Sequence, residues 1–216
     1  MKSDTQLRDD IVAELEWDPA INANQIGVAV KDGVVSLSGH IDSYAEKWAV
    51  EKALNRIQGV RAAALELDVR LSPDHKRGDT DIAKAAQWAL EWHSQVPPDA
   101  VRVTVDKGWL TLQGEVEWSF QRDSAIKAVR NLKGVLGVSS EITLKKKPMR
   151  SDLKQRIRDA LTRQAVREAN HLSVDIQGDE VTLRGRVHSL REREAARGAA
   201  WSAPGVGLII DDMTVE

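Results

Sequence analysis

The 216-residue chain has no cysteine, one phenylalanine, one tyrosine and no long run of apolar residues. Without cysteine it has no disulfides, no thiolate metal ligands and no cysteine nucleophile. Its apolar runs are far shorter than the roughly 20 residues that a transmembrane helix needs. A net charge of −2 also lacks the basic excess typical of nucleic-acid-binding proteins. We therefore expect a globular chain with no nucleic-acid partner.

The chain starts with MKSDTQLRDD, which begins with methionine and contains no apolar core of a signal peptide. From this start alone we expect a cytoplasmic location, or a periplasmic one if a leader has been removed from the chain. Seven of the nine aromatic residues are tryptophan. That skew makes the positions of the tryptophans the first place to look for a function.

A motif repeats three times along the chain, as DGVVSLSGHI at 32–41, KGWLTLQGEV at 107–116 and GDEVTLRGRV at 178–187. Two sets of glycines have the same spacing of 75 and then 71 residues. The first set is Gly39, Gly114 and Gly185, and the second is Gly59, Gly134 and Gly205. A shared offset over this length indicates three homologous units. We place them at 1–71, 79–147 and 151–216.

Each unit opens with an amphipathic helix. In the first unit Leu7, Ile11 and Leu15 recur at the i, i+4, i+8 interval of one helix face. The same offsets carry this stripe to Ile82, Ala86 and Leu90 and to Leu153, Ile157 and Leu161. Small polar residues stand just before the stripe, and we expect them to be the N-caps: Thr5, Thr80 and Ser151.

Two alternating runs follow each helix and predict a β-hairpin. Asp32-Gly33 and Lys107-Gly108 lie between the runs, where a tight turn is expected, so Gly33 and Gly108 are turn glycines. Gly39 shares the inward face of the second run, as do its equivalents Gly114 and Gly185. A missing side chain at that position predicts a close backbone or helix approach, or a bulge.

A second helix is expected at about 43–57, 118–132 and 189–202, with small residues at helical intervals. Gly59, Gly134 and Gly205 follow as helix-stop signals before a last alternating run. The fold class is therefore α+β, with three tandem α-β-β-α-β domains, each a small mixed three-stranded sheet covered by two helices. A β-α-β crossover makes the third strand parallel to the second. The pattern leaves open which strand it lies beside.

This pattern resembles the BON domain of bacteria, with DGVVSLSGHIDS as the best match and nearly the whole chain covered. The third copy departs most, since it has Gly178-Asp179 in the turn and Glu180 where an apolar residue is usual. The resemblance implies a non-enzymatic module associated with phospholipid or envelope surfaces and with osmotic stress. It supplies no catalytic residues, because the motif positions are structural.

The residues give no sign of a catalytic or cofactor site. The glycines flank a strand, whereas dinucleotide and phosphate loops need G-x-G-x-x-G or G-x-x-x-x-G-K-[ST]. The five histidines fall at non-equivalent positions of the repeat and show no metal-ligand spacing. Adjacent acidic pairs diverge on a helix or strand and cannot share a proton. We expect no enzyme, no metal and no cofactor.

Trp88 and Trp92 form an apolar ridge with Ala85 and Ala89, off the core stripe of their helix. In the first unit only Trp17 is apolar and large at the equivalent positions, and the third unit is polar there. Two interpretations remain. The favoured one buries the ridge against another domain of the chain. The other makes it a contact for lipid or a protein partner, since amphipathic tryptophan suits both surfaces.

Other residues extend these hypotheses. Trp109 and Trp118 lie in the same unit and could enlarge the surface, whereas Trp48 and Trp201 are expected to be packing residues. A basic run between the second and third units is either a solvated linker or a segment that attracts anionic lipid headgroups. Its members are Lys145, Lys146, Lys147 and Arg150.

Two functions follow as hypotheses. The first is a binding protein that associates with anionic phospholipid, a membrane surface or envelope components, or with a protein partner, in connection with stress. The second is a holdase-like chaperone or scaffold that uses the tryptophan ridge for protein clients.

Overall fold

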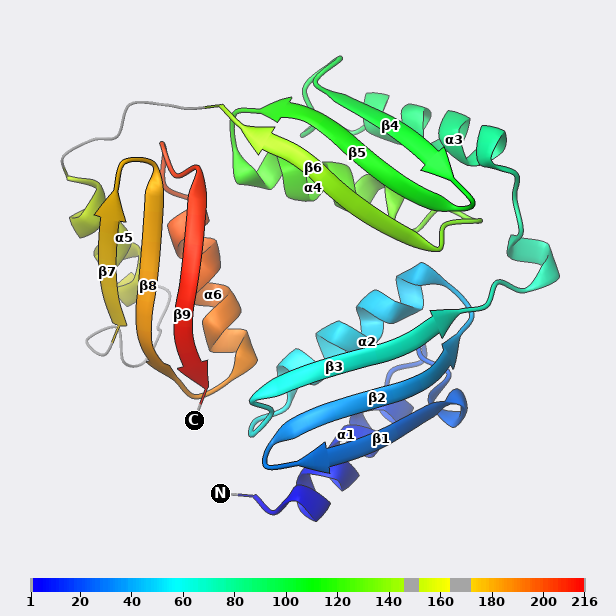
Figure 1. Cartoon of the computed structure of the whole chain (residues 1–216), viewed down its shortest axis with the longest axis horizontal. Helices are drawn as coiled ribbons and strands as arrows, with labels where there is room; N and C mark the ends of the chain where they lie inside the picture. The colour runs from blue at the N-terminus through cyan, green and yellow to red at the C-terminus, as the bar shows by residue number, and fades with distance from the viewer. Residues whose placement is uncertain (1, 146–151, 164–171, 216) are drawn as a thin grey trace.

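A computed structural model of the chain describes residues 2–145, 152–163 and 172–215. It contains three repeats of one α-β-β-α-β unit, each with a three-stranded mixed sheet and two long helices (Figure 1). The expected α+β class and the threefold repetition are confirmed. The first repeat comprises α1 (Asp4–Trp17), β1 (Ile26–Lys31), β2 (Val34–Ile41), α2 (Tyr44–Arg56) and β3 (Ala62–Val69).

The second and third repeats follow the same order. The second comprises α3 (Asp79–Glu91), β4 (Val101–Asp106), β5 (Trp109–Val116), α4 (Ser119–Val129) and β6 (Gly137–Leu144). The third comprises α5 (Leu153–Arg163), β7 (Leu172–Gln177), β8 (Glu180–Val187), α6 (Leu190–Trp201) and β9 (Leu208–Val215). Two 3-10 helices, Ala23–Gln25 and Pro73–His75, precede β1 and α3.

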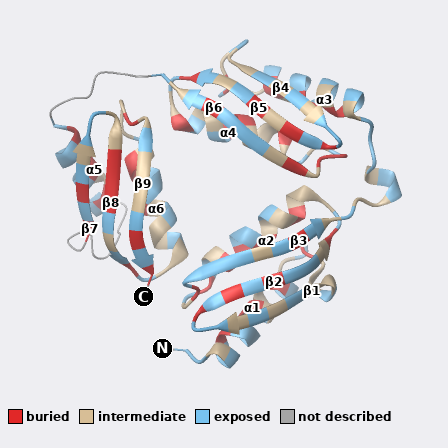
Figure 2. Cartoon of the chain, in the orientation of Figure 1, coloured by how far each residue is buried: buried red, intermediate tan, exposed pale blue. Residues whose placement is uncertain are grey.

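The strand order within each sheet is the order along the chain. β2 pairs with β1 antiparallel and with β3 parallel, and the other two sheets repeat this arrangement. The question that the pattern left open is thereby answered, because the third strand lies beside the second. The central strand of each sheet carries the most deeply buried row, and the edge strands are more exposed (Figure 2).

Each repeat has its own hydrophobic core. The predicted helix stripes are fully buried in these cores, for example Leu7, Ile11 and Leu15 at 2% exposure or less. The expected N-caps are wrong. Ser3 caps α1 through a capping box with Gln6, and Gly78 caps α3 without a side chain. α1 begins at Asp4 and α3 at Asp79, so Thr5 and Thr80 are already the second residues of their helices. Ser151 lies outside the described residues.

The hairpin turns form as expected in the first two repeats. Asp32 and Gly33 both have positive φ, as do Lys107 and Gly108, which is the backbone of a type I′ turn. In the turn of the third repeat Gly178 has positive φ and Asp179 does not. The different turn expected from Gly178-Asp179 is therefore present.

The repeated glycines of the central strands are not buried as expected, since Gly39 is exposed and Gly114 half-buried, but they do mark a close backbone approach. Gly39 has φ +134°, and a Cβ there would overlap the carbonyl oxygen of Gln25. Gly114 has φ +150° and meets the carbonyl oxygen of Ala100 in the same way. No other residue fits this place without moving the chain that enters the first strand.

The second helices α2, α4 and α6 surround the centre of the molecule and join the repeats to one another (Figure 1). The helix-start residues Tyr44, Ser119 and Leu190 occupy equivalent positions, and each contacts the next repeat. Tyr44 packs on the second core, and Leu190 packs on the first. The Ser119 hydroxyl donates to the carbonyl oxygen of Trp201 at 3.2 Å.

A second set of contacts follows the same cyclic order. The Arg130 guanidinium lies 3.6 Å from the centre of the Trp48 ring, and Arg122 lies 4.6 Å from that of Trp201. The Asn55 amide donates to Glu194 at 3.3 Å, which joins the first repeat to the third. Equivalent positions thus make head-to-tail contacts that close into a ring, as such interfaces do when the rotation closes. Trp201 is half-buried within the ring, as expected of a packing residue, whereas Trp48 stays 37% exposed with its ring stacked against Arg130.

Candidate interaction surface

The tryptophan ridge of α3 is exposed. Trp88 is 70% exposed and Trp92, the C-cap residue of α3, is 85% exposed. Lys84 is exposed one helical turn before Trp88, so a cation precedes the two rings on the same side of the helix. Two indole rings one turn apart beside an ammonium group can contact an apolar surface with anionic groups over Lys84, and the exposed Glu91, three residues after Trp88, carries the opposite charge.

The favoured sequence interpretation, burial of this ridge between domains, is wrong. The repeats contact one another through α2, α4 and α6, and these helices carry the inter-repeat contacts described above. The first helices pack instead on the first strands of their own sheets. The ridge therefore stays outside the ring contacts.

The equivalent surfaces of the other repeats are charged. Trp17 is 83% exposed, but Arg56 beside it is paired with Glu14 and Asp18. The Ala20 backbone N–H and the Arg56 guanidinium together lower the pKa of Asp18. In the third repeat Arg163 occupies the place of Trp17 and is exposed. As the sequence predicted, the second repeat is the apolar member of the three.

The structure separates Trp109 from the ridge and places Trp118 at the start of α4. Trp109 points to the face of β5 opposite the buried Leu110 and Leu112, so the sheet separates it from α3. Its ring lies over Gly137 of the neighbouring strand, which leaves no room for a Cβ there. Trp118 is half-buried at the start of α4, where its backbone N–H donates to Gln121. Trp109 therefore does not enlarge the ridge, and the hypothesis that Trp118 enlarges it stays a prediction.

The basic run lies mostly outside the described residues. Lys145 follows β6, is exposed, and its backbone N–H donates to the Val116 carbonyl oxygen at 2.8 Å. Lys146, Lys147 and Arg150 lie outside the described residues. The hypothesis that this run attracts anionic headgroups stays a prediction.

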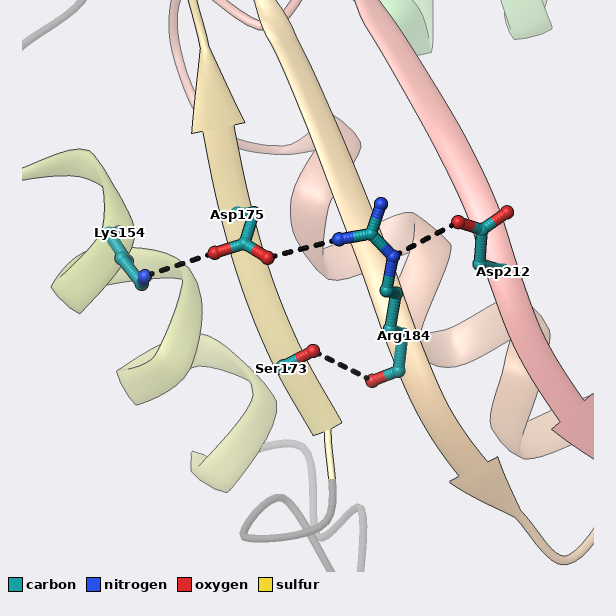
Figure 3. A network of polar contacts seen from close by, with 5 residues as sticks. All are labelled: Lys154, Ser173, Asp175, Arg184 and Asp212. Carbon is teal, nitrogen blue, oxygen red and sulfur yellow. Dashed lines mark hydrogen bonds and ion pairs between the residues drawn. The ribbon is translucent and has the colours of Figure 1, made fainter.

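The open face of the third sheet carries a network of paired charges (Figure 3). The Arg184 guanidinium contacts Asp175 and Asp212, each at 3.2 Å, and Lys154 reaches Asp175 at 3.4 Å. The Ser173 hydroxyl donates to the Arg184 carbonyl oxygen at 3.4 Å. Because each charge has an opposite neighbour, this network neutralises itself and offers little excess charge to a ligand.

The buried carboxylate of Glu46 has a structural use. Its two oxygens accept the backbone N–H groups of Asn22 at 2.7 Å and Asp42 at 2.8 Å. Gln121 and Glu192 stand at the equivalent positions and accept backbone N–H groups at the same helix start. Among the described residues no group of three or more His, Cys, Asp or Glu is arranged to hold a metal ion. No described helix is long and apolar enough to cross a membrane.

Sequence reasoning missed two acidic residues that hold the hairpin turns. The Asp4 carboxylate accepts the N–H groups of Asp32 and Gly33, at 2.8 and 3.1 Å. Asp79 does the same for Lys107 and Gly108, at 2.7 and 2.9 Å. An aspartate at one repeat position in two units, replaced by Arg150 in the third, is the signal that could have revealed them.

Comparison with known proteins gives the family. The BON domain model matches residues 3–70, 78–146 and 150–216. The chain is 26% identical over 146 residues to osmotically-inducible protein Y of Escherichia coli strain K12, covering 66% of this chain and 73% of that protein.

Solved structures give weaker likenesses. CdsD, a structural protein of the type III secretion system of Chlamydia trachomatis, matches at a TM-score of 0.25 and 12% identity, covering 98% of this chain and 92% of that one. The PrgH periplasmic domain matches at a TM-score of 0.20 and 9% identity, covering 89% and 95%. At these scores neither says anything of function.

The expected cytoplasmic location is contradicted, because osmotically-inducible protein Y is periplasmic. That expectation rested on the first ten residues, whose composition does not establish a location. The family model covers nearly the whole of each repeat, and its three matches follow the three sheets. The chain belongs to the BON domain family.

Proposed function

We propose that this chain is a non-enzymatic binding protein that associates with anionic phospholipid surfaces through Trp88 and Trp92. The observation that supports the proposal is the exposure of both rings, 70% and 85%, on a helix that takes no part in closing the ring. The relationship to an osmotically-inducible protein supports a role linked to osmotic stress.

The physical basis is burial of the two indoles together with attraction of a cation. Moving a tryptophan side chain out of water contributes on the order of 3 kcal/mol, from its large area and about 25 cal/mol per Å². Lys84, one turn before Trp88, adds about 1 kcal/mol near an anionic surface. A contact of this size is reversible and weakens with added salt.

Flotation of the purified chain with liposomes tests the proposal. We expect salt-sensitive association with vesicles containing anionic lipid, little with purely zwitterionic vesicles, and loss of association in the double variant Trp88→Ala, Trp92→Ala. Trp109→Ala is the matched control, because it removes an exposed tryptophan from the opposite side of the same repeat. Equal flotation of the double variant and the wild type would disprove the lipid contact at this ridge.

The competing function is a holdase-like chaperone or protein scaffold that uses the same ridge. A second assay distinguishes it from lipid binding. It requires suppression of the aggregation of an unfolded client without any lipid. If that suppression occurs, is lost in the double variant, and vesicle binding is absent, the ridge serves proteins in place of membranes.

A further inference from the structure

A groove runs along the outer edge of the second sheet, between β4 and the C-terminal half of α3. Its floor is apolar and formed by Leu90, Val96, Val101 and Val103. Its charged lining residues are two acids, Glu91 and Asp99, and one base, Arg102. β4 is the outermost strand of its repeat, on the side away from the second helices (Figure 1). The ring contacts therefore leave this groove open.

The backbone of β4 offers unpaired hydrogen-bonding groups along the groove. Asp106 and Trp109 flank a two-residue turn, so they form a hydrogen-bonded pair. Hydrogen-bonded and non-hydrogen-bonded pairs alternate along an antiparallel ladder, so Thr104 and Arg102 are the other residues of β4 that hydrogen-bond to β5. The Glu115 N–H donating to the Ala100 carbonyl oxygen agrees with this alternation. The N–H and C=O groups of Val101, Val103 and Val105 consequently point away from β5. No backbone hydrogen bond from another described element reaches them.

The side chains of the same three valines are incompletely covered. Val101, Val103 and Val105 are half-buried, whereas Leu172 and Val174, at the start of the equivalent strand of the third repeat, are fully buried. Half-covered aliphatic side chains next to unpaired backbone groups are the two features that a strand-adding peptide uses. Main-chain hydrogen bonds supply affinity, and alternate side chains supply specificity.

We propose that this groove binds an extended segment of a protein partner, which adds as a further strand to the free edge of β4. The segment carries small aliphatic residues at alternate positions, which enter the groove over Val101 and Val103. A basic residue beside them pairs with Glu91 or Asp99. The groove borders the lipid-contact ridge on α3, since Glu91 lies about one helical turn after Trp88. The two sites use different residues, because Gln87 and Glu91 line the groove whereas neither Trp88 nor Trp92 does.

A short synthetic peptide of alternating valine and threonine with a lysine at each end is the probe. We expect saturable binding by fluorescence anisotropy, and slower amide exchange at Val101, Val103 and Val105 in nitrogen-15-labelled protein. The same peptide with alternate backbone amides methylated should bind at least about tenfold more weakly, because it loses the main-chain hydrogen bonds.

Two variants block the site in different ways. Val103→Pro removes an outward N–H that β5 does not use, and Gln87→Trp fills the groove from the helix side. Both should weaken peptide binding by about tenfold or more. The double variant Trp88→Ala, Trp92→Ala should bind the peptide as the wild type does, which separates this site from the lipid proposal.

Absence of peptide binding overturns the proposal, as does equal binding of the methylated peptide or of both blocking variants. Concentration-dependent pairing of two copies of the chain through β4, seen by sedimentation and abolished by Val103→Pro, would also overturn it. In that outcome the occupant is a second copy of the chain.

Discussion

The Arg130 guanidinium lies 3.6 Å from the centre of the Trp48 ring and joins the second repeat to the first. Burial lowers the pKa of Arg130, and its Nε atom has no hydrogen-bond partner. The contact with the ring face of Trp48 therefore offsets much of the cost of removing the Arg130 charge from water. Cation–π contacts of this kind contribute about 0.5 to 2 kcal/mol, more when the cation is desolvated.

Trp48→Ala should lower the free energy of unfolding by about 1 to 2 kcal/mol, because it removes this contact and part of the ring interface. Urea denaturation followed by circular dichroism measures the change. A double-mutant cycle with Arg130→Met should give a coupling of about 1 kcal/mol. Trp17→Ala is the control, since its ring is 83% exposed and outside the interface. Strictly additive effects of the two interface substitutions would contradict a direct contact.

The contact that closes the ring, between the third and first repeats, contains two acidic residues. Glu51 is exposed, but partial desolvation where α2 contacts α6, and then the nearby charge of Glu194, raise its pKa, while Lys47 opposes the shift. A carboxyl with a raised pKa in the folded state prefers to be protonated there. It therefore destabilises the fold as pH rises from the unfolded pKa, about 4.3, through the higher folded value.

Glu51→Gln should consequently stabilise the protein at pH 7 and have little effect near pH 4, where both states of the wild type are largely protonated. Urea midpoints at the two pH values measure this difference. Glu66→Gln, on the exposed face of β3, serves as the comparison and should not reproduce it. A Glu51→Gln variant that is less stable at pH 7 than the wild type would show that the charge is favourable at this contact.

The fold could be predicted from the sequence because its signals are local and occur three times. The stripe at Leu7, Ile11 and Leu15 and the turn at Asp32-Gly33 each follow from a few neighbouring residues. The strand order and the ring could not be predicted, since they depend on contacts such as Asn55 with Glu194, 139 residues apart. The exposure of Trp88 depends on those contacts too, because it is decided by which helices join the repeats.

The sequence predicted an inward-facing Gly39, whereas the structure leaves Gly39 exposed, and the reason for a glycine there needed the structure. Gly39→Ala should cost about 3 kcal/mol or more, because φ is +134° and the new methyl would overlap the Gln25 carbonyl oxygen. Gly78→Ala is the matched control, since its φ is −76° and nothing lies within 4 Å of the added methyl. Thermal or urea unfolding of the two variants measures the difference. Similar losses in both would mean that the chain entering β1 shifts without cost.

The Asp79 carboxylate ties the start of α3 to the turn between β4 and β5. Asp79→Ala removes an ionised acceptor from two backbone N–H groups and should lower the free energy of unfolding by about 1.5 to 3 kcal/mol. Asp81→Ala is the control, because Asp81 lies in the same first turn and shares the interaction with the helix dipole.

Amide exchange gives the local readout of this tie. The N–H groups of Lys107 and Gly108 should exchange faster in Asp79→Ala than in Asp81→Ala, because the aspartate at position 79 is their acceptor. Asp79→Asn keeps one acceptor oxygen and should fall between the wild type and the alanine variant. If exchange at both amides is the same in the two alanine variants, the carboxylate does not hold the turn in solution, and any loss of stability comes from the helix alone.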